Sequence, residues 1–295
     1  MLNSLYSGIT GMKAQQTKMD VLANNIANVN TTGFKSQRVR FQDMISQMDS
    51  NAQGPNGNGR GGINAQQVGL GSSVSATDLM MQGGALQFTG RALDFGIQNG
   101  DNSFFVVSQD GNPGGRHQYT RDGGFYTDYE GNLTTANGMR VMGFSTEIMT
   151  EESDYDATAL TQENNFGALS IPQTYNGLAL QDYSIDDTGT IIGTYSDGNA
   201  YIIGRLALST FTNADGLEKA GENLYNASTN SGAPTIGGPT DDGFGTVRSG
   251  FTEMSNVDLA TEFTEMIVAS RAYQANTRSI TTSDEMLQEL INLKR

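Results

Sequence analysis

The last forty residues carry apolar side chains at heptad intervals, a pattern typical of an amphipathic helix. One track is filled throughout, and a second is apolar at its ends but polar in its middle. The first track is Leu259, Met266, Tyr273, Ile280 and Leu287; the second is Phe263, Ser270, Thr277, Asp284 and Ile291. No Gly or Pro interrupts residues 255–295. The pattern predicts a helix of roughly 60 Å, which needs a partner along its length.

Both ends of this helix carry terminal signals. Ser255 precedes Asp258 by three residues, which is a capping-box spacing and predicts that the helix begins at Ser255. Lys294 and Arg295 place positive charge at the other end, where the helix dipole favours it.

A second apolar stripe follows the same three-four spacing at the start of the chain. Its members are Leu2, Leu5, Ile9, Met12, Met19, Ala23 and Ile26. Gly8 and Gly11 lie within it, and we interpret them as sites of close packing against a neighbouring backbone. The sequence therefore predicts an N-terminal helix (residues 1–30) that pairs with the C-terminal helix (residues 251–295) as a stalk.

Residues 31–92 lack a regular pattern and are predicted to be an extended arm that wraps along the helices. Within them, residues 54–62 read GPNGNGRGG and contain a formal GxGxxG match. Because no strand precedes it and no helix follows, it does not predict a nucleotide site. We expect no cofactor.

Residues 93–250 alternate short apolar stretches with turn dipeptides. The turns are Asn99-Gly100, Asp110-Gly111, Asp122-Gly123, Glu130-Gly131, Asn137-Gly138, Asp187-Thr188-Gly189 and Asp197-Gly198. This spacing predicts a strand-turn-strand meander. Residues 146–168 break the rhythm with acidic and polar content, which indicates a surface insertion. The predicted fold class is α+β: paired terminal helices, a mainly antiparallel all-β central domain and an extended wrapping segment.

Composition narrows the possible functions. There are 17 Lys and Arg against 32 Asp and Glu, a net charge of −15, which argues against nucleic acid and anionic membranes as partners. Solubility alone would also explain this balance. Cysteine is absent, which suits an exported protein and excludes the usual zinc sites. The first residues lack the basic start and apolar run of a cleaved signal, and no stretch reaches membrane-spanning length.

Little in the sequence is typical of catalysis, and we expect no enzyme. The carboxylates of Asp122, Asp187, Asp197 and Asp215 stand at turn positions, where Asp is favoured for backbone reasons. Asp241-Asp242 could hold calcium weakly but does not match EF-hand spacing. A secreted adhesive or carbohydrate-active β domain remains an alternative at this point.

The predicted helices carry more apolar surface than one helix pair buries. Lys13, Lys18 and Asp20 are the only charged residues of the first helix. A stalk with so few charges would expose apolar surface and tend to associate. A heterologous contact repeated between copies gives an open helical assembly. We therefore expect self-assembly, although an intramolecular hairpin would also account for the stripes.

Two terminal motifs carry a family resemblance. ANNIANVNTTGFK (residues 23–35) resembles the signature of the axial proteins of the bacterial flagellum, which comprise rod, hook and hook-associated proteins. Residues 255–295 are similar to the C-terminal helix of this family, and the blocks beginning at Leu93 and Tyr119 resemble its β domain. Asp258-Leu259-Ala260, Thr281–Asp284 and the ending Asn292–Arg295 favour the hook over the distal rod.

The resemblance implies a homopolymer of terminal helices around a central export channel. The hook would be a flexible universal joint, and the distal rod a rigid drive shaft. Expected partners are other copies, the distal rod, the hook cap, the hook-filament junction protein and the flagellar type III export machinery. Besides the two stripes, the signature residues Asn24, Asn25, Asn28, Gly33 and Phe34 are expected to serve self-assembly.

Overall fold

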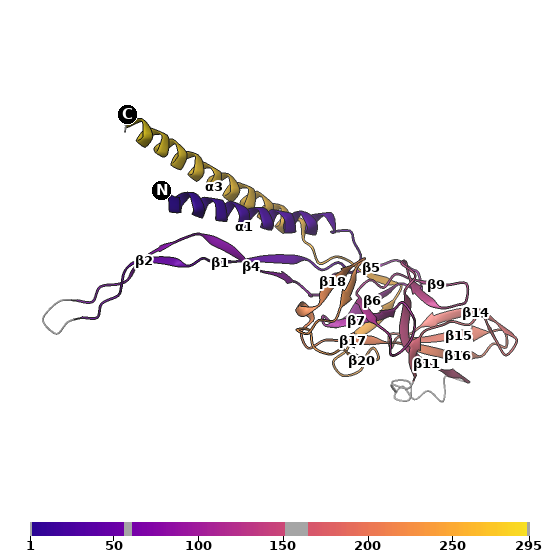
Figure 1. Ribbon diagram of the computed structural model, residues 1–295. Coiled ribbons are helices and arrows are strands. Elements are labelled where there is room, and N and C mark those ends of the chain that lie inside the picture. Colours follow the sequence, from indigo (N-terminus) through magenta and orange to yellow (C-terminus); the bar gives the residue numbers. More distant parts are fainter. Residues whose placement is uncertain (1, 56–60, 151–164, 294–295) are drawn as a thin grey trace. The chain divides into compact units, whose positions relative to one another are not determined.

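The computed structural model describes residues 2–55, 61–150 and 165–293 and divides into two compact units (Figure 1). The terminal unit comprises Met1–Ala27, Gln37–Asp78 and Asp258–Arg295; the β unit comprises Asn28–Ser36 and Leu79–Val257. The boundaries expected at residues 30, 92 and 250 differ from this division. The segments 28–36, 79–92 and 251–257 belong to the β unit because they pair with its strands and side chains.

Two long helices form most of the terminal unit. α1 (Leu2–Ala27) and α3 (Leu259–Leu293) pack against each other, which confirms the predicted pairing (Figure 1). α3 begins four residues later than expected. Asp258, and not Ser255, caps it: the Asp258 carboxylate accepts hydrogen bonds from the Ala260 amide (3.0 Å) and the Thr261 hydroxyl (2.7 Å). The capping-box prediction at Ser255 was therefore wrong.

Extended chain completes the terminal unit. β1 (Gln37–Asp43) pairs with β4 (Ser72–Leu79), and β2 (Ser46–Ser50) pairs antiparallel with β3 (Gln66–Gly69). The ribbon lies against α1, where Gly71 approaches Ser7 and Thr10 too closely for a side chain to fit. The expected extended arm is thus present, and it lies along the helix.

The β unit contains the remaining strands and one short 3-10 helix, η3 (Ala214–Gly216). In sequence order the strands are β5 (Leu86–Phe88), β6 (Phe95–Gln98), β7 (Ser103–Ser108), β8 (His117–Thr120), β9 (Phe125–Thr127), β10 (Leu133–Thr135), β11 (Arg140–Thr150), β12 (Phe166–Ala168), β13 (Thr174–Tyr175), β14 (Leu178–Ile185), β15 (Thr190–Tyr195), β16 (Ala200–Leu206), β17 (Leu208–Thr210), β18 (Glu218–Gly221), β19 (Leu224–Asn226), β20 (Thr235–Gly237), β21 (Thr246–Ser249) and β22 (Phe251–Glu253).

One large sheet organises these strands. Its order is β13-β14-β15-β16-β11-β7-β8-β19-β18, with β12, β10 and β9 joined through β11, and β17 and β20 joined through β7. Two ribbons, β6-β21 and β5-β22, stand outside it. The pairings among these strands are antiparallel, as predicted.

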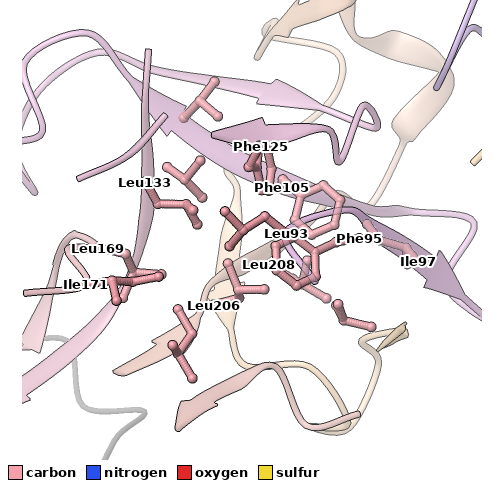
Figure 2. Packing of buried hydrophobic residues seen from close by; sticks show 14 of the residues in the cluster. Leu93, Phe95, Ile97, Phe105, Phe125, Leu133, Leu169, Ile171, Leu206 and Leu208 are labelled. Atoms are coloured by element: carbon pink, nitrogen blue, oxygen red, sulfur yellow. The ribbon is translucent and has the colours of Figure 1, made fainter. Parts of the chain in front are cut away.

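The core lies on both faces of β7. Phe105 and Val107 point into one apolar cluster, which Figure 2 shows together with Phe95 and Phe125. The alternate residues Phe104 and Val106 point into a second cluster. Because side chains alternate along a strand, the unbroken apolar run is explained by a strand buried on both sides.

The predicted turns have mixed outcomes. Those at Glu130-Gly131, Asn137-Gly138, Asp187-Thr188-Gly189 and Asp197-Gly198 join paired neighbouring strands, and the glycine in each has positive φ. The hairpin expected across Asn99-Gly100 was wrong: β6 pairs with β21 and not with β7. Strands on the two sides of a turn are apolar whether or not they pair with each other. The sequence pattern therefore does not show which turns join paired strands.

Some expectations fall outside the described residues. They concern most of the acidic insertion (151–164), the centre of the glycine-rich stretch (56–60) and the closing charges of Lys294 and Arg295. Within the described part of the chain, no helix has an apolar stretch long enough to cross a membrane.

Candidate assembly surface

Small and polar side chains line the contact between α1 and α3. The Ser4 and Ser283 hydroxyls lie 3.4 Å apart. A Cβ added to Gly8 would lie 2.9 Å from Cγ1 of Ile280, and one added to Gly11 would lie 2.8 Å from Nδ2 of Asn276. The two glycines therefore let the helices approach closely, which confirms the close packing predicted for them.

Polar contacts hold the other half of this helix pair. Lys18 Nζ lies 3.1 Å from Oε2 of Glu265. Asn25 is buried and donates to both carboxylate oxygens of Glu262, each at 3.3 Å. The Asn25 side chain also accepts from the Gln37 amide (3.0 Å) and donates to the Gln37 carbonyl (2.9 Å). Burial raises the pKa of Glu262, although the bond from Asn25 opposes this shift. Asn25 thus joins α1, β1 and α3.

The predicted heptad stripe of α3 is divided between two environments. Met266, Ile280 and Leu287 are half-buried, whereas Leu259, Phe263 and Ile291 are exposed and Tyr273 is borderline. Ala269 and Ser283 are buried and Asn276 is half-buried, each one position before the predicted Ser270, Thr277 and Asp284. The most buried residues on this face of α3 are thus displaced by one position, although the predicted Thr277 also reaches α1: its hydroxyl lies 3.3 Å from Sδ of Met12.

The stripe of α1 is displaced in the same way. Gly8, Leu22 and Asn25 are buried, whereas the predicted residues Leu5, Met12, Met19 and Ile26 are half-buried and Ile9 is exposed. Because α1 contacts α3 through glycine and asparagine, its large apolar side chains remain accessible to a further partner.

Large apolar side chains are exposed along the whole terminal unit and are named here the apolar surface. They are Tyr6, Ile9, Phe41, Met44, Ile45, Met48, Ile63, Val68, Leu259, Phe263, Ile267, Val268, Tyr273, Met286, Leu290, Ile291 and Leu293. Exposed apolar side chains in this number are typical of a surface that other molecules cover.

The end of the signature segment packs inside the β unit. Gly33 has φ of 67°, and a Cβ there would lie 2.6 Å from the Asp122 amide nitrogen, so only glycine fits. The Gly33 amide donates to the Glu253 carbonyl at 2.8 Å. Phe34 is buried, with Lys219 Nζ 4.5 Å from its ring centroid. Gly33 and Phe34 therefore have intramolecular partners, and their contribution to self-assembly stays a prediction.

Asn28 and Asn24, the other predicted signature residues, precede this packed segment. The Asn28 side-chain oxygen accepts from the Thr31 hydroxyl at 3.2 Å, and its carbonyl accepts from the Thr31 amide at 3.1 Å. Asn24 is exposed on α1. Asn28 thus closes the turn that follows the helix.

Three buried charges meet next to Gly33. The side chains of Lys35, Arg121 and Glu253 are 0%, 1% and 0% exposed. Lys35 Nζ lies 2.6 Å from Oε1 of Glu253, and Arg121 Nη1 lies 3.0 Å from Oε2. Burial and the neighbouring Arg121 guanidinium lower the pKa of Lys35, against the opposing effect of Glu253. One carboxylate thus compensates two buried cations.

The same cluster binds every segment that leads into the terminal unit. Lys35 donates to the Gln82 carbonyl (2.8 Å), and the Asn256 side chain accepts from the Ser36 amide (2.8 Å) and donates to the Met80 carbonyl (2.8 Å). Segments 28–36, 79–84 and 253–257 are therefore fixed to one another within the β unit. Lys35, Arg121, Glu253 and Asn256 are named here the junction cluster.

The sequence prediction missed the junction cluster. Lys35 follows the signature directly, but Glu253 is 218 positions away. A lone Lys or Glu is expected at the surface, and nothing in the local pattern indicates that these two are buried together.

The carboxylates considered earlier serve structure. Asp122 accepts from the Gly124 amide and Thr32 hydroxyl, and Asp197 accepts from the Asn199 amide, as expected of turn residues. Asp241 lies 3.2 Å from the guanidinium of the buried Arg205, so the weak calcium site considered at Asp241-Asp242 was wrong. Across residues 2–55, 61–150 and 165–293, no group of three or more His, Cys, Asp or Glu residues is placed to hold a metal ion.

Paired terminal helices with exposed apolar side chains, and a β unit with its own core, are typical of a subunit of a larger assembly. Three family profiles match the chain. "Flagella basal body rod protein" covers residues 5–35, "Flagellar hook protein FlgE/F/G D1 domain" covers 99–193, and "Flagellar basal body rod FlgEFG protein C-terminal" covers 248–293.

Individual relatives agree with these profiles. The chain is 46% identical to the flagellar basal-body rod protein FlgG of Bacillus subtilis over 296 positions, with both chains covered completely. It is 32% identical to the flagellar hook protein FlgE of Borreliella burgdorferi over 448 positions, again with complete coverage. A crystal structure of the Helicobacter pylori hook protein FlgE2 aligns with 65% of this chain and 47% of that one, at 18% identity and a TM-score of 0.24.

The chain belongs to the flagellar rod and hook family of axial proteins. It is a structural component of the rod and hook part of the flagellum, and the members of this family build an axial structure and are not enzymes.

Proposed function

We propose that the chain is a subunit of the distal rod, a rigid drive shaft that polymerises around a central export channel. The observation that supports this proposal is that the chain aligns with a rod protein from end to end with almost no insertion. The chain aligns with a basal-body rod protein over 296 positions that cover both chains completely, whereas its alignment with the hook protein extends over 448 positions. The chain has 295 residues, so it lacks the additional length that the hook relative carries.

In this proposal the apolar surface is the assembly surface. Ile9, Leu259, Phe263, Tyr273 and Ile291 are exposed members of the predicted set, and they would be buried by neighbouring copies. The half-buried members hold the helix pair in the shape that neighbours recognise: Leu5, Met12, Met19, Ile26, Met266, Ile280 and Leu287.

Further partners follow from the family. Other copies of the chain would surround each subunit, and hook subunits would continue the axis beyond them. The hook cap and the hook-filament junction protein would act further along that axis. The subunit would reach its place through the flagellar type III export machinery without a cleaved signal.

The hook is the second candidate. The residues Asp258-Leu259-Ala260 and the segment Thr281–Asp284 resemble hook proteins and motivate it. A flexible joint would need bending, and a drive shaft would need stiffness, so the shape of the polymer distinguishes the two functions.

Complementation tests this directly. The chain is expressed in one strain that lacks its distal rod gene and in another that lacks its hook gene, and basal bodies are examined by electron microscopy. We expect straight rods and restored motility in the first strain only. Curved tubes in the hook-deficient strain would establish the hook instead, and no assembly in either strain would contradict both functions.

A second experiment tests the assembly surface. Replacing both Phe263 and Tyr273, which are exposed members of this surface, by Glu is expected to abolish incorporation into basal bodies, because charges would face an apolar contact. The matched control deletes residues 151–164, which lie outside the described residues, and should assemble normally. Assembly of the double variant would contradict the proposed surface.

A further inference from the structure

Two groups of aromatic and arginine side chains lie on the β unit, and the backbone bonds from Thr89 to Gly250 and from Gly250 to Asp94 bring their segments together. Phe88 is 70% exposed and packs edge-to-face on Phe251, with ring centroids 5.3 Å apart. The Arg248 guanidinium lies 5.7 Å from the Phe251 centroid, and that of Arg91, three residues after Phe88, lies 4.6 Å from the Tyr126 centroid. These five residues are named here the arginine-aromatic strip. Arginine and aromatic residues are enriched among interface hot spots.

The strip is basic on an acidic unit. The β unit contains eight Lys and Arg against 22 Asp and Glu, a net charge of −14. Arg91 is held in place by Asp94 (3.1 Å) and by the Phe125 carbonyl (2.8 Å). Arg248 is exposed and forms no ion pair with a described carboxylate. A second acidic unit would therefore be repelled by most of this surface and attracted to the strip.

A hollow adjoins the Arg248 end of the strip. Its volume is about 600 Å³, and its lining includes the apolar side chains of Leu86, Ile97 and Phe251 and the polar side chains of Gln98, Asp101 and Arg248. A mainly polar hollow with an apolar part and a cation suits a tyrosine, whose ring is apolar and whose hydroxyl is polar, when a carboxylate accompanies it.

The β unit also carries a projection with that chemistry. Tyr129 is 94% exposed, at the tip of the β9-β10 turn, between the exposed carboxylates of Asp128 and Glu130. Gly131 holds the turn and has a φ of 85°. Its amide donates to the Asp128 carbonyl (2.9 Å), and its carbonyl accepts from the Ile171 amide (2.7 Å). A turn fixed in this way loses little entropy when it binds.

We propose that the Asp128–Gly131 turn of one copy docks on the arginine-aromatic strip of the next copy, with Tyr129 in the hollow. The carboxylates of Asp128 and Glu130 then face Arg248 and Arg91. The turn and the hollow are formed by different residues, so in an open polymer the contact repeats from copy to copy. The proposal rests on the proposed function, because it specifies how β units meet once the terminal units have polymerised.

The absence of native cysteine allows a clean cross-linking test. Tyr129→Cys and Arg248→Cys are made in separate full-length chains and co-expressed in a strain without its own distal rod gene. A short bismaleimide is added to the cells, and basal bodies are isolated. We expect a cross-linked dimer only when both variants are present, and none with either variant alone. Asp197→Cys, at another exposed turn, replaces Tyr129→Cys in the control and should give no dimer with Arg248→Cys.

The outcomes separate this proposal from the function it rests on. Motile cells with no dimer would overturn the docking while the rod function stands, and an unmodified chain that fails to restore motility would refute the rod function itself. If a cysteine variant does not assemble, exchanging the charges of Glu130 and Arg248 tests the docking instead. Glu130→Arg and Arg248→Glu should each reduce assembly severalfold, and their combination should restore it; failure of the combination to restore assembly overturns the docking.

Discussion

The two units of this chain use their apolar residues in opposite ways. In the β unit, Phe95, Phe105 and Phe125 are fully buried on one face of β7 (Figure 2), and Phe104 is fully buried on the other. In the terminal unit the large apolar side chains are mostly exposed, and its helix contact runs through glycine, serine and asparagine. The β unit therefore completes a core within one chain, whereas the terminal unit leaves its largest hydrophobic gain to contacts with other molecules.

Charge divides in the same way. The β unit has a net charge of −14, and the terminal unit, with nine basic and ten acidic residues, has a net charge of −1. Repulsion between acidic units disfavours unspecific association, while a nearly neutral apolar unit can pack closely against copies of itself. The comparison predicts that most of the stability of the single chain comes from the β unit and that the terminal unit supplies the main apolar contact for assembly.

The largest expected effect concerns the junction cluster. Glu253→Ala removes the carboxylate that compensates two buried cations, Lys35 and Arg121. We expect a loss of about 3–5 kcal/mol in the free energy of unfolding of the β unit, because an unpaired buried charge is costly. Urea denaturation followed by near-UV circular dichroism measures it.

A double variant sharpens this result. Lys35→Met combined with Glu253→Ala removes one of the uncompensated charges, so the combined loss should be smaller than the sum of the single losses. Strict additivity would show that the two buried charges do not interact, and a loss below about 1 kcal/mol for Glu253→Ala would contradict the assigned role.

The next effect compares one substitution in the two units. Phe105→Ala is expected to lower the free energy of unfolding by about 3–5 kcal/mol, because Phe105 is fully buried in a close-packed core. Phe263→Ala, at a residue that is 50% exposed, should change it by less than about 0.5 kcal/mol.

Assembly should rank these variants differently. Phe263→Ala is expected to reduce incorporation into basal bodies although the chain remains folded, and immunoblots of isolated basal bodies measure this. If Phe263→Ala assembled normally, or if it destabilised the monomer as strongly as Phe105→Ala, the separation between core and assembly surface would fail.

The sequence predicted most of the architecture because periodic patterns report local burial. The two terminal helices and the turns at Glu130-Gly131 and Asp197-Gly198 follow from heptad spacing and from glycine at positive φ. These features depend on neighbours within a few residues, and the sequence shows such neighbours directly.

The remaining features depend on contacts between distant residues. Nothing near Glu253 indicates Lys35 or Arg121 as its partners, and nothing near β6 indicates that it pairs with β21. The helix contact was predicted only in part, because heptad spacing favours large apolar residues. Gly8 packs against Ile280, which belongs to the predicted stripe, whereas Gly11 packs against Asn276, which does not.

A smaller effect tests that helix contact. Gly8→Ala favours the helix by about 1 kcal/mol of intrinsic helix propensity. The added Cβ, however, would lie 2.9 Å from Cγ1 of Ile280. We expect the overpacking to outweigh the gain by about 1 kcal/mol, seen as weaker hydrogen-exchange protection of α1. Ile280→Val in the same chain should recover part of the loss. Stabilisation by Gly8→Ala alone would show that the helices do not depend on the close approach.

The smallest expected effect is at the start of α3. Bonds from the Thr261 hydroxyl and the Ala260 amide hold the pKa of Asp258 below its usual range. The ionised cap therefore contributes stability above the pKa of an unfolded aspartate, about 3.9, and this contribution is lost as the pH falls through the lower folded value. Amide exchange in the first turn of α3, compared with the middle of the helix, should accelerate severalfold over that interval. Asp258→Asn retains a hydrogen-bond acceptor that does not titrate, so this variant should show no such step. In Asp258→Ala the same amides should exchange rapidly at every pH. The same pH step in Asp258→Asn would assign the effect to another group.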